Sequence, residues 1–580
     1  MKELMLGNAA VARGAYEAGV RFVSSYPGTP STEITEFMAK YPESDVYCEW
    51  APNEKVSAEA AVGASIAGAR AMTCCKHVGL NVMADPFFTA SYTGVRGGLV
   101  ICVADDPGMH SSQNEQDSRH YARASKIPML EPSDSEECLQ FTKLAFELSE
   151  RFDTPVFLRL TTRVAHSQSL VTVGERQGVP LLPYEKDPRK YVMMPGNAIV
   201  RHPVVEARTK AVSEASRTLA CNRVENHGMP TGVVCSGINY LYAKEAFGDR
   251  VNYLKLGLVW PVDGESIRAF ADACEKVYVL EELDPFLEDI CTSFGVDVIG
   301  KEAFPLEGEY SSSLVRSVVF HEQIPFASPK ETVPPRPPAM CPGCPHRGVF
   351  YVLSKMKLIV SGDIGCYTLG ALKPLSALDS TICMGASVSA AHGMAKVRGD
   401  EWKGKLVSVI GDSTFMHSGM TALSDVVYNQ GSNTVIILDN SITGMTGHQD
   451  NPLTGKTIRG AATRQADLIT ICRGLGVDRI SVIDPFDLNA LENALKTELA
   501  SDEPSVIIAQ RPCALLKSVH YSGRCVVTED CIKCRRCMKL GCPAISLRGQ
   551  RADIDATLCV GCGLCVQVCP RGAIQTEEKQ

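Results

Sequence analysis

Two cysteine-rich runs near the end of the chain constrain its fold more than any other feature. They read CIKCRRCMKLGCP and CVGCGLCVQVCP, and they repeat with a period of 28 residues, from Cys531 to Cys559. In each run three cysteines are separated by two residues, and a fourth cysteine precedes a proline. This doubled spacing is typical of a small domain that holds two [4Fe–4S] clusters, in which the fourth cysteine of each run ligates the other cluster. We therefore predict a bacterial ferredoxin-like α+β domain over residues 521–580.

The crossed arrangement assigns each of these cysteines to one cluster. The first cluster is predicted to use Cys531, Cys534, Cys537 and Cys569, and the second Cys559, Cys562, Cys565 and Cys542. The first run has one extra residue before its last cysteine, which changes the loop there. A pair of zinc sites is the alternative, since C-x2-C is also a zinc spacing. Eight cysteines in this doubled order favour the clusters, which carry single electrons and therefore need a source of them.

Length and composition indicate a globular protein of several domains. The chain has 580 residues, of which 45% are hydrophobic and 21% charged, and a formal net charge of −8. This mild acidity argues against nucleic acid as a partner, which would need a basic face. No apolar run approaches the roughly 18 residues that span a bilayer. The first twenty residues predict an amphipathic helix and not a signal peptide, so we expect a cytoplasmic protein.

Three α/β segments precede the cysteine-rich tail. Over residues 1–171, apolar runs such as VRFVSSY and GGLVICVA alternate with Ala-rich helical stretches, which indicates a parallel sheet. Residues 172–328 contain a helical connector around 200–225 and the predicted strands TGVVCS, VNYLKLG and KVYVLEE. The Pro-rich stretch SPKETVPPRPPAM is a predicted linker, and residues 329–520 follow with the strands LVSVIG, TVIILDN and SVIIAQ. The predicted fold is therefore several doubly wound α/β domains followed by the ferredoxin-like domain.

Polar residues follow two consecutive strands of the third segment. The strand LVSVIG leads into Gly411, Asp412 and Ser413, and TVIILD leads into Asn440. The intervening length suits one crossover helix, so the two strand ends are predicted to lie side by side at the carboxyl edge of the sheet, where ligands bind. A carboxylate, an amide oxygen and a backbone carbonyl, predicted as that of Ile442, suit a Mg²⁺ ion that also binds phosphates. Ordinary turn residues are the alternative.

These strand ends resemble the thiamine diphosphate motif, in which GDG is followed after about 25 residues by NN. Here the motif reads GDS and DN. Thiamine chemistry also needs a buried glutamate against the aminopyrimidine ring, and the segment NEKVSAEAAVGASIAGAR is similar to the helix that carries it. This similarity assigns Glu54, with Glu59 as the competitor and a solvated helix glutamate as the alternative. Loss of carbon dioxide from a 2-oxo acid on the cofactor leaves an electron-rich carbon, which is a suitable source for the clusters.

Further motifs follow one another along the chain. They are YPGTPSTEI, CPGCPHR, SGDIGCYTLG, ICMGASVSAAHG, GDSTF and DNSITGMTGHQ. Together with the tail they resemble the thiamine diphosphate-dependent 2-oxoacid:ferredoxin oxidoreductases, and within that family the indolepyruvate branch, over essentially the whole chain. The resemblance implies that residues 1–171 bind the aminopyrimidine, that 172–328 form a transketolase C-terminal-like domain, and that 329–520 bind the diphosphate and Mg²⁺.

The resemblance also implies roles for two residues of the first segment. Thr29 of YPGTP would lie near the substrate, and its residue type also predicts an N-cap for a helix whose first residue is Pro30. The free N–H groups of such a helix suit a carboxylate, and a plain helix cap is the alternative. Arg119 falls roughly where the family places an arginine for the substrate carboxylate, and a surface arginine is the alternative.

Four more cysteines fall where related enzymes bind a cluster close to thiamine. They are Cys341, Cys344, Cys366 and Cys513. The sequence leaves two interpretations open: a third [4Fe–4S] cluster, or a loop turn with buried free cysteines.

The resemblance implies an activity, cofactors and partners. The activity is oxidative decarboxylation of aryl 2-oxo acids, indolepyruvate among them, with coenzyme A, giving aryl-acetyl-CoA and carbon dioxide and reducing ferredoxin. The cofactors are thiamine diphosphate, Mg²⁺ and two [4Fe–4S] clusters, with the third left open. The partners are ferredoxin and a smaller beta subunit in an α2β2 assembly. The alternatives are a different 2-oxo acid, a non-redox thiamine decarboxylase, and an electron-transfer subunit with inactive α/β domains.

Overall fold

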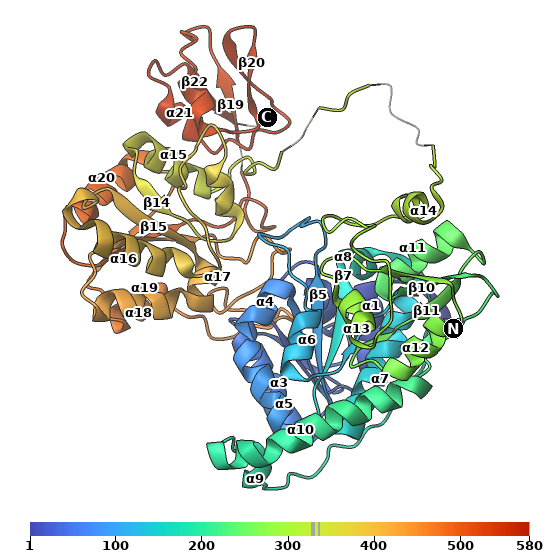
Figure 1. Cartoon of the computed structure of the whole chain (residues 1–580). Coiled ribbons are helices and arrows are strands. Elements are labelled where there is room, and N and C mark those ends of the chain that lie inside the picture. The colour runs from blue at the N-terminus through green and yellow to red at the C-terminus, as the bar shows by residue number, and fades with distance from the viewer. Residues whose placement is uncertain (326–330, 335–336, 522, 579–580) are drawn as a thin grey trace. The chain divides into compact units, whose positions relative to one another are not determined.

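The computed structural model describes residues 1–325, 331–334, 337–521 and 523–578, and it divides into two compact units (Figure 1). Unit 1 is Met1–Lys330 and unit 2 is Glu331–Gln580. The predicted Pro-rich linker, residues 328–340, lies partly outside the described residues. In the described part of the chain, no helix combines the length and the apolar composition that crossing a membrane requires.

A seven-stranded sheet forms the centre of unit 1, and it is parallel except at one edge. In spatial order its strands are β12 (Leu258–Trp260), β6 (Met129–Leu130), β7 (Val156–Thr161), β5 (Leu99–Asp105), β4 (Ala71–Lys76), β2 (Phe22–Ser25) and β3 (Tyr47–Trp50). Only the short edge strand β12 runs antiparallel to its neighbour. The parallel α/β sheet predicted from the alternating apolar runs is confirmed.

Helices alternate with these strands, as the right-handed crossovers of a parallel sheet require. They are α1 (Gly7–Glu17), α2 (Thr32–Met38), α3 (Glu54–Ile66), α4 (His77–Val82), α5 (Ala84–Thr93), α6 (Arg119–Ser125), α7 (Ser135–Phe152), α8 (Thr162–His166) and the long α10 (Pro195–Ala215). Asn53 and Asp134 cap α3 and α7 by accepting a hydrogen bond from an N–H of the first helical turn. Three side chains at the carboxyl edge of the sheet, Glu54, His77 and Arg119, thus stand at the first residue of a helix.

A second sheet of unit 1 has four strands. In spatial order they are β13 (Lys276–Leu280), β10 (Thr231–Cys235), β11 (Asn252–Lys255) and the antiparallel β9 (Arg223–Glu225), with helices α11 (Gly237–Phe247), α12 (Gly264–Asp272), α13 (Phe286–Ser293) and α14 (Ser312–Phe320). Buried residues of both sheets, such as Ile101 and Val279, belong to one hydrophobic cluster. Strand β8 (Gln168–Thr172) spans the boundary predicted at residue 171, and β12 joins the first sheet. The two predicted domains therefore share one core, and their separate status stays a prediction.

The amphipathic helix predicted over the first twenty residues is only partly correct. The chain begins with strand β1 (Lys2–Leu6), which pairs antiparallel with β8, and α1 starts at Gly7. The partner strand lies more than 150 residues away by number. A pairing of this range overrides the local helical pattern.

The helix predicted to start at Pro30 begins later. The amide and the hydroxyl of Ser31 both donate to the carbonyl of Gly28, at 2.9 Å each, and this closes a turn over residues 28–31. Helix α2 is seven residues long and starts at Thr32 with Ser31 as its N-cap. Thr29 is therefore a half-buried loop residue, and its predicted role as helix cap is wrong.

Unit 2 is built on a fully parallel five-stranded sheet. In spatial order its strands are β14 (Ile359–Ser361), β15 (Leu406–Gly411), β16 (Thr434–Asp439), β18 (Ser505–Gln510) and β17 (Arg479–Ile483). One core cluster packs α15 (His346–Met356) and α20 (Leu488–Leu499) on one face, and another packs α16 (Ala386–Arg398), α18 (Met420–Tyr428) and α19 (Leu468–Gly474) on the other (Figure 1). The two layers of helices make it a doubly wound sheet, which confirms the predicted fold class.

The cysteine-rich tail repeats its structure as well as its sequence. Strand β19 (Gly523–Val527) pairs with β22 (Ile574–Glu578), and β20 (Ile545–Arg548) pairs with β21 (Arg551–Ile554), both antiparallel. The 3₁₀ turn Arg536–Leu540 of the first repeat corresponds to helix α21 (Leu564–Val568) of the second, 28 residues later. Tail residues share a core cluster with α15 and the sheet, so the tail packs as part of unit 2.

Candidate active site and iron–sulfur centres

The carboxyl ends of β15 and β16 bring two carboxylates together in unit 2. The strands are parallel neighbours with Gly411 opposite Leu438, so Asp412 and Asp439 follow side by side. Burial and the nearby Asp439 raise the pKa of Asp412 well above its usual range. Its Oδ1 accepts the amide of Ser413 at 2.8 Å, while its Oδ2 is buried with no hydrogen-bond partner among the described residues. A divalent cation would relieve both the repulsion and the unpaired oxygen, so the residues present fit a metal site.

Asn440 stands next to these carboxylates and is almost fully buried. Its Oδ1 accepts the amide of Ile442 at 3.3 Å, and its Nδ2 lies 3.5 Å from Nε2 of His346. A hydrogen bond of 3.0 Å between the hydroxyls of Ser413 and Thr443 joins the loops that follow the two strands. The structure thus brings the predicted Gly411–Ser413 and Asn440–Ile442 segments to one edge of the sheet.

A π-helical turn, Phe415–Gly419, follows the short helix α17 (Asp412–Thr414). Such turns are rare and frequently occur at functional sites. Sequence reasoning missed this turn, and it also gave no role to His346, although the CPGCPHR motif contains it. The signal available for His346 was its position two residues after Cys344.

Four thiols of unit 2 gather beside Asn440. Cys513 donates its amide to the carbonyl of Asn440 at 2.9 Å, and a methyl group added to Gly444 would lie 3.6 Å from both Asn440 Nδ2 and Cys366 Sγ. Burial raises the pKa of the Cys366 thiol, and the neighbouring Cys513 and Cys341 raise it further. Burial likewise raises the pKa of Cys344 to about 12, with Cys341 and Cys366 contributing. Each of the four thiols, Cys341, Cys344, Cys366 and Cys513, therefore lies near at least two of the others.

Two cavities of the tail are lined by cysteines, and each contains one of the crossed sets that the repeat predicts. One cavity contains Cys531, Cys534, Cys537 and Cys569, and the other contains Cys542, Cys559, Cys562 and Cys565 together with a fifth cysteine, Cys525. Backbone amides support two of these sulfurs: Cys525 donates to Cys559 Sγ and Ala573 to Cys569 Sγ, each at 3.2 Å. Four thiols converging on one enclosed space are the donor set of a [4Fe–4S] cluster, so the tail fits two of them.

The CPGCPHR loop connects the second tail cavity to the thiols beside Asn440. Pro342 and Gly343, which lie between Cys341 and Cys344, line that cavity together with Arg347. Arg347 is buried and donates to the carbonyls of Leu540 at 2.7 Å and Cys341 at 3.1 Å. Within unit 2 the CPGCPHR loop therefore joins the thiols beside Asn440 to the second tail cavity.

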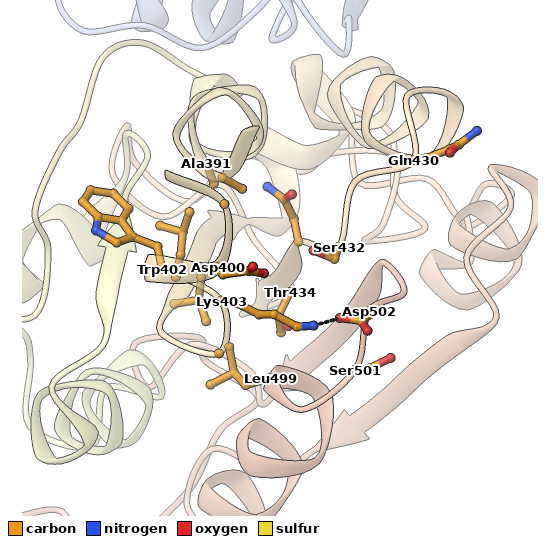
Figure 2. Close-up of a pocket in the computed structure, with 16 residues that line it drawn as sticks. Ala391, Asp400, Trp402, Lys403, Gln430, Ser432, Thr434, Leu499, Ser501 and Asp502 are labelled. Atoms are coloured by element: carbon orange, nitrogen blue, oxygen red, sulfur yellow. Dashed lines mark ion pairs between the residues drawn. The ribbon is translucent and has the colours of Figure 1, made fainter. Parts of the chain in front are cut away.

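A further cavity of unit 2, larger than either tail cavity, lies at the opposite end of the sheet (Figure 2). It is lined by residues at the amino ends of β15 and β16, such as Leu406 and Thr434, and by Asp400, and an ion pair between Lys403 and Asp502 crosses it. Asp412 and Asn440 follow the carboxyl ends of the same strands. We therefore do not assign this cavity to the cofactor.

In unit 1 the structure distinguishes the two candidate glutamates of α3. Glu54 is 5% exposed, and its carboxylate packs so closely against Gly79 that an added methyl group there would lie 2.5 Å from Glu54 Oε1. Glu59 is exposed and forms an ion pair with Lys55 one turn earlier. Of the two, only Glu54 has the burial that a contact with a cofactor ring requires.

Arg119 lies in a buried network of charges in unit 1. Each of its three side-chain nitrogens donates to a protein oxygen: Nε to Asp117, Nη1 to Glu281, and Nη2 to Asp117 and to the carbonyls of Glu282 and Asp284. Arg159, also buried, completes the network through Asp105 and Glu131, each at 2.7 Å. These contacts argue against the predicted clamp on a substrate carboxylate, because the guanidinium is already neutralised.

Three family models match separate parts of the chain. The model described as "Pyruvate flavodoxin/ferredoxin oxidoreductase, thiamine diP-bdg" matches residues 13–229. "Thiamine pyrophosphate enzyme, C-terminal TPP binding domain" matches 363–509, and "4Fe-4S binding domain" matches 552–575. Fold, site and matches define an oxidoreductase whose cofactors are thiamine diphosphate and iron–sulfur clusters.

Relatives along the whole chain define the family within this class. The chain is 40% identical to "Indolepyruvate oxidoreductase subunit IorA" of Archaeoglobus fulgidus, over 99% of this chain and 97% of that protein. It is 39% identical to the protein of the same name in Thermococcus kodakarensis, over 99% and 96%. This chain belongs to the IorA family of indolepyruvate oxidoreductase subunits.

More distant similarities cover less of the chain. "2-oxoglutarate synthase subunit KorA" of Methanothermobacter thermautotrophicus is 28% identical over 47% of this chain and 86% of that protein. A solved 2-oxoglutarate:ferredoxin oxidoreductase from Magnetococcus marinus is 20% identical, with a TM-score of 0.47, over 55% of this chain and 65% of that one.

Proposed function

We propose that this chain is the catalytic subunit of an enzyme that oxidatively decarboxylates aryl 2-oxo acids, indolepyruvate among them, with coenzyme A. The 2-oxo acid loses its carboxyl group as carbon dioxide, the remaining acyl group forms a thioester with coenzyme A, and the two electrons released pass singly to ferredoxin. The names of the relatives give the substrate class.

One observation supports the proposal: in unit 2, cysteine-lined cavities and a group of cysteines lie on the same side of the sheet as residues that fit a metal ion. Asp412 and Asn440 stand at one end, the cysteines beside Asn440 come next, and the two tail cavities follow. A non-redox decarboxylase would have no use for such a series of sites, because it transfers no electrons. An electron-transfer subunit with an inactive sheet would have no use for the buried, unpaired Asp412 oxygen.

We assign roles to the residues at the two sheet edges as follows. Asp412, the Asn440 amide oxygen and the Ile442 carbonyl bind Mg²⁺, which holds the diphosphate of the cofactor. Gly411 and Ser413 flank the diphosphate, and Glu54 contacts the aminopyrimidine. When bound, thiamine diphosphate supplies the carbon nucleophile for the 2-oxo group. The buried Glu54 holds a proton at the ring, and Thr29 lies in the loop that borders the substrate.

The four thiols beside Asn440 are proposed to ligate a third [4Fe–4S] cluster. A cluster there would shorten each electron-transfer step between the cofactor and the tail clusters. Buried free cysteines, the alternative that the sequence leaves open, would explain the burial but not the convergence of residues 341, 344, 366 and 513 from distant parts of the chain.

The family name implies a second, smaller subunit, and we propose an α2β2 assembly that delivers electrons to ferredoxin. Iron–sulfur ligation by so many thiols suits a reducing compartment, and we place the protein in the cytoplasm.

Iron content tests the cluster assignments. Anaerobically prepared protein is expected to contain about twelve iron atoms per chain if three clusters are present and about eight if only the tail binds them. Cys366→Ser should remove about four of twelve, whereas Cys472→Ser, a buried thiol of α19 away from these groups, should remove none. Iron at eight in the wild type would contradict the third cluster.

Paired variants test the crossed ligation. Cys569→Ser combined with Cys531→Ser should lose no more iron than either alone, since both serve one cluster. Cys569→Ser combined with Cys559→Ser should lose both tail clusters. The reverse pattern would contradict the crossed sets.

Substrate turnover tests the activity. With the small subunit, coenzyme A and indolepyruvate, the clusters should be reduced within the assay, as seen by bleaching of their visible absorption. Bound iron and thiamine without any reduction by arylpyruvates, but reduction by another 2-oxo acid, would move the substrate class and keep the chemistry.

A further inference from the structure

Strand β4 ends in a lysine, and a histidine follows it directly, at the carboxyl edge of the seven-stranded sheet. Lys76 is the last residue of β4 and is 7% exposed, and His77 begins α4 and is fully buried. His77 Nε2 lies 3.2 Å from the Asn114 carbonyl, while its Nδ1 is buried with no hydrogen-bond partner among the residues described. The edge therefore carries two buried polar groups that the assignments above leave without a role.

Lys76 is poorly neutralised for a buried cation. The hydrogen bond described for its ammonium group goes to the backbone carbonyl of Ser111, so two of its three N–H donors remain for other acceptors in this part of the structure. Burial lowers the pKa of Lys76 to about 8, and the raising effect of Asp106 does not offset it. A buried ammonium without a paired carboxylate is costly, which favours an anion nearby.

Asp106 cannot serve as that anion in full, because other donors occupy its oxygens. Its Oδ2 accepts the amide of Ser111 at 2.8 Å and the hydroxyl of Ser112 at 2.6 Å, and its Oδ1 accepts the hydroxyl of Thr162 at 2.6 Å. No ion pair between Asp106 and Lys76 is found within 4 Å in the described part of unit 1. The contrast with Arg119 is direct, since that cation is bound by two carboxylates.

Lys76 also lies close to the residues assigned to the substrate and cofactor. A methyl group added to Gly28, the neighbour of Thr29, would lie 3.1 Å from Cβ of Lys76, so the stem of the lysine packs on the YPGTP loop. Three residues after Lys76, Gly79 packs against the carboxylate of Glu54. The YPGTP loop, the β4 end and the start of α3 thus meet on one part of the edge.

We propose that Lys76 binds the carboxylate of the 2-oxo acid substrate, with His77 as an adjacent polar contact. The proposal rests on the function proposed above and names a different cation from the predicted Arg119. Because the contact is made to the group that leaves as carbon dioxide, it strengthens binding of the substrate more than it stabilises the transition state.

Inhibitor pairs test the proposal through charge. The carboxylate 3-phenylpropionate and its neutral amide have the same shape and differ at the group that Lys76 would contact. In Lys76→Met, the inhibition constant of the carboxylate should rise about 10- to 100-fold, while that of the amide stays unchanged. Lys76→Arg should recover part of the loss. Lys55→Met, at an exposed lysine of α3, is the matched control and should change neither constant.

Chemical protection gives a readout that needs no turnover. In wild-type holoenzyme, 3-phenylpropionate should slow acetylation of Lys76 by acetic anhydride, as measured by peptide mass spectrometry, and leave acetylation of Lys55 unchanged. If Lys76→Met fails to retain thiamine and iron, its inhibition constants cannot be compared with those of the wild type. The protection measured in the wild type then tests the proposal by itself.

The outcomes separate the two proposals. Equal inhibition constants in Lys76→Met and wild type, or no protection of Lys76, would overturn the role of the lysine while turnover of arylpyruvates continues. Absence of turnover with every arylpyruvate, together with protection of Lys76 by the carboxylate, would overturn the proposed substrate class and leave an anion site at Lys76.

Discussion

The carboxyl edges of the two large sheets differ in the charges that remain after internal pairing. At the five-stranded sheet, Asp412 and Asp439 lie together without an ion pair to a cation among the residues described. At the seven-stranded sheet, Arg119 and Arg159 pair with four carboxylates, and Lys76 is left with a carbonyl. The edge of the five-stranded sheet therefore favours a bound cation, and the edge of the seven-stranded sheet favours a bound anion. The residues responsible can be identified only when the ion pairs of all charged side chains at each edge are known.

The comparison shows that a charged residue at the carboxyl end of a strand is a candidate for ligand binding only if its charge is not already neutralised by another residue of the protein. Both edges carry charged residues where ligands bind in doubly wound sheets. Arg119 is charged, buried and at the start of a helix, yet it is committed to the protein. Asp412 and Lys76 are the residues whose charge is still uncompensated.

The largest effect is expected from Asp412→Asn. The amide has one oxygen fewer and no charge, so Mg²⁺ and the diphosphate should bind far more weakly. Arylpyruvate-dependent cluster reduction should fall by about a thousandfold, with loss of bound thiamine diphosphate, measured after desalting. Asp400→Asn, at the amino edge of the same sheet, is the control and should leave both unchanged. Full thiamine content in Asp412→Asn would show that the two edges do not differ in the way described.

Arg119→Met is expected to act on stability. Burial works to raise the pKa of Asp117, but Arg119 and Arg159 outweigh it and hold the pKa below its usual range. Removing Arg119 leaves Asp117 and Glu281 buried with less compensation, which should cost about 3–5 kcal/mol and lower the first thermal transition followed by circular dichroism.

Lys76→Met is the matched comparison for Arg119→Met. Since burial lowers the pKa of Lys76, the folded state disfavours the charged amine, and its loss should leave stability unchanged or raise it. Equal destabilisation by the two variants would contradict the proposed difference between Arg119, whose charge is neutralised by buried carboxylates, and Lys76, whose charge is not.

Sequence patterns predicted the elements that depend on local spacing. The strands that end at Gly411 and Asp439 follow from short apolar runs, and the crossed cysteine sets follow from the 28-residue period. These features are specified by residues close together in the chain, so the pattern contains the information needed.

Contacts between distant residues were beyond such patterns. Arg119 bonds to Glu281, 162 residues away, and β1 pairs with a strand at residues 168–172. Helix α2 starts at Thr32 and not at Pro30, because Ser31 donates a hydrogen bond to the carbonyl of Gly28 and closes a turn before the helix. The preference of proline for the first position of a helix does not predict this turn. The position of Lys76 could have been recognised from the sequence, because it is a charged residue at the carboxyl end of an apolar strand, as Asp412 is.

The smallest effect concerns Glu282, a buried residue whose backbone carbonyl accepts a hydrogen bond from Arg119. Burial raises its pKa to about 7, with Glu309 and Glu131 adding to the shift and the Tyr310 amide, 2.8 Å from Oε1, opposing it. An acid with a raised pKa keeps its proton longer in the folded state, so its contribution to stability is full below about pH 4.5 and is lost as pH rises through about 7.

Glu282→Gln should remove that dependence. The free energy of unfolding of the wild type should fall by at most about 3 kcal/mol between pH 5 and 8 relative to the variant, measured by urea denaturation at each pH. Glu265→Gln, at an exposed carboxylate of α12, should keep the wild-type slope. A Glu282→Gln slope equal to that of the wild type would mean that burial does not raise the pKa of Glu282 in the folded protein.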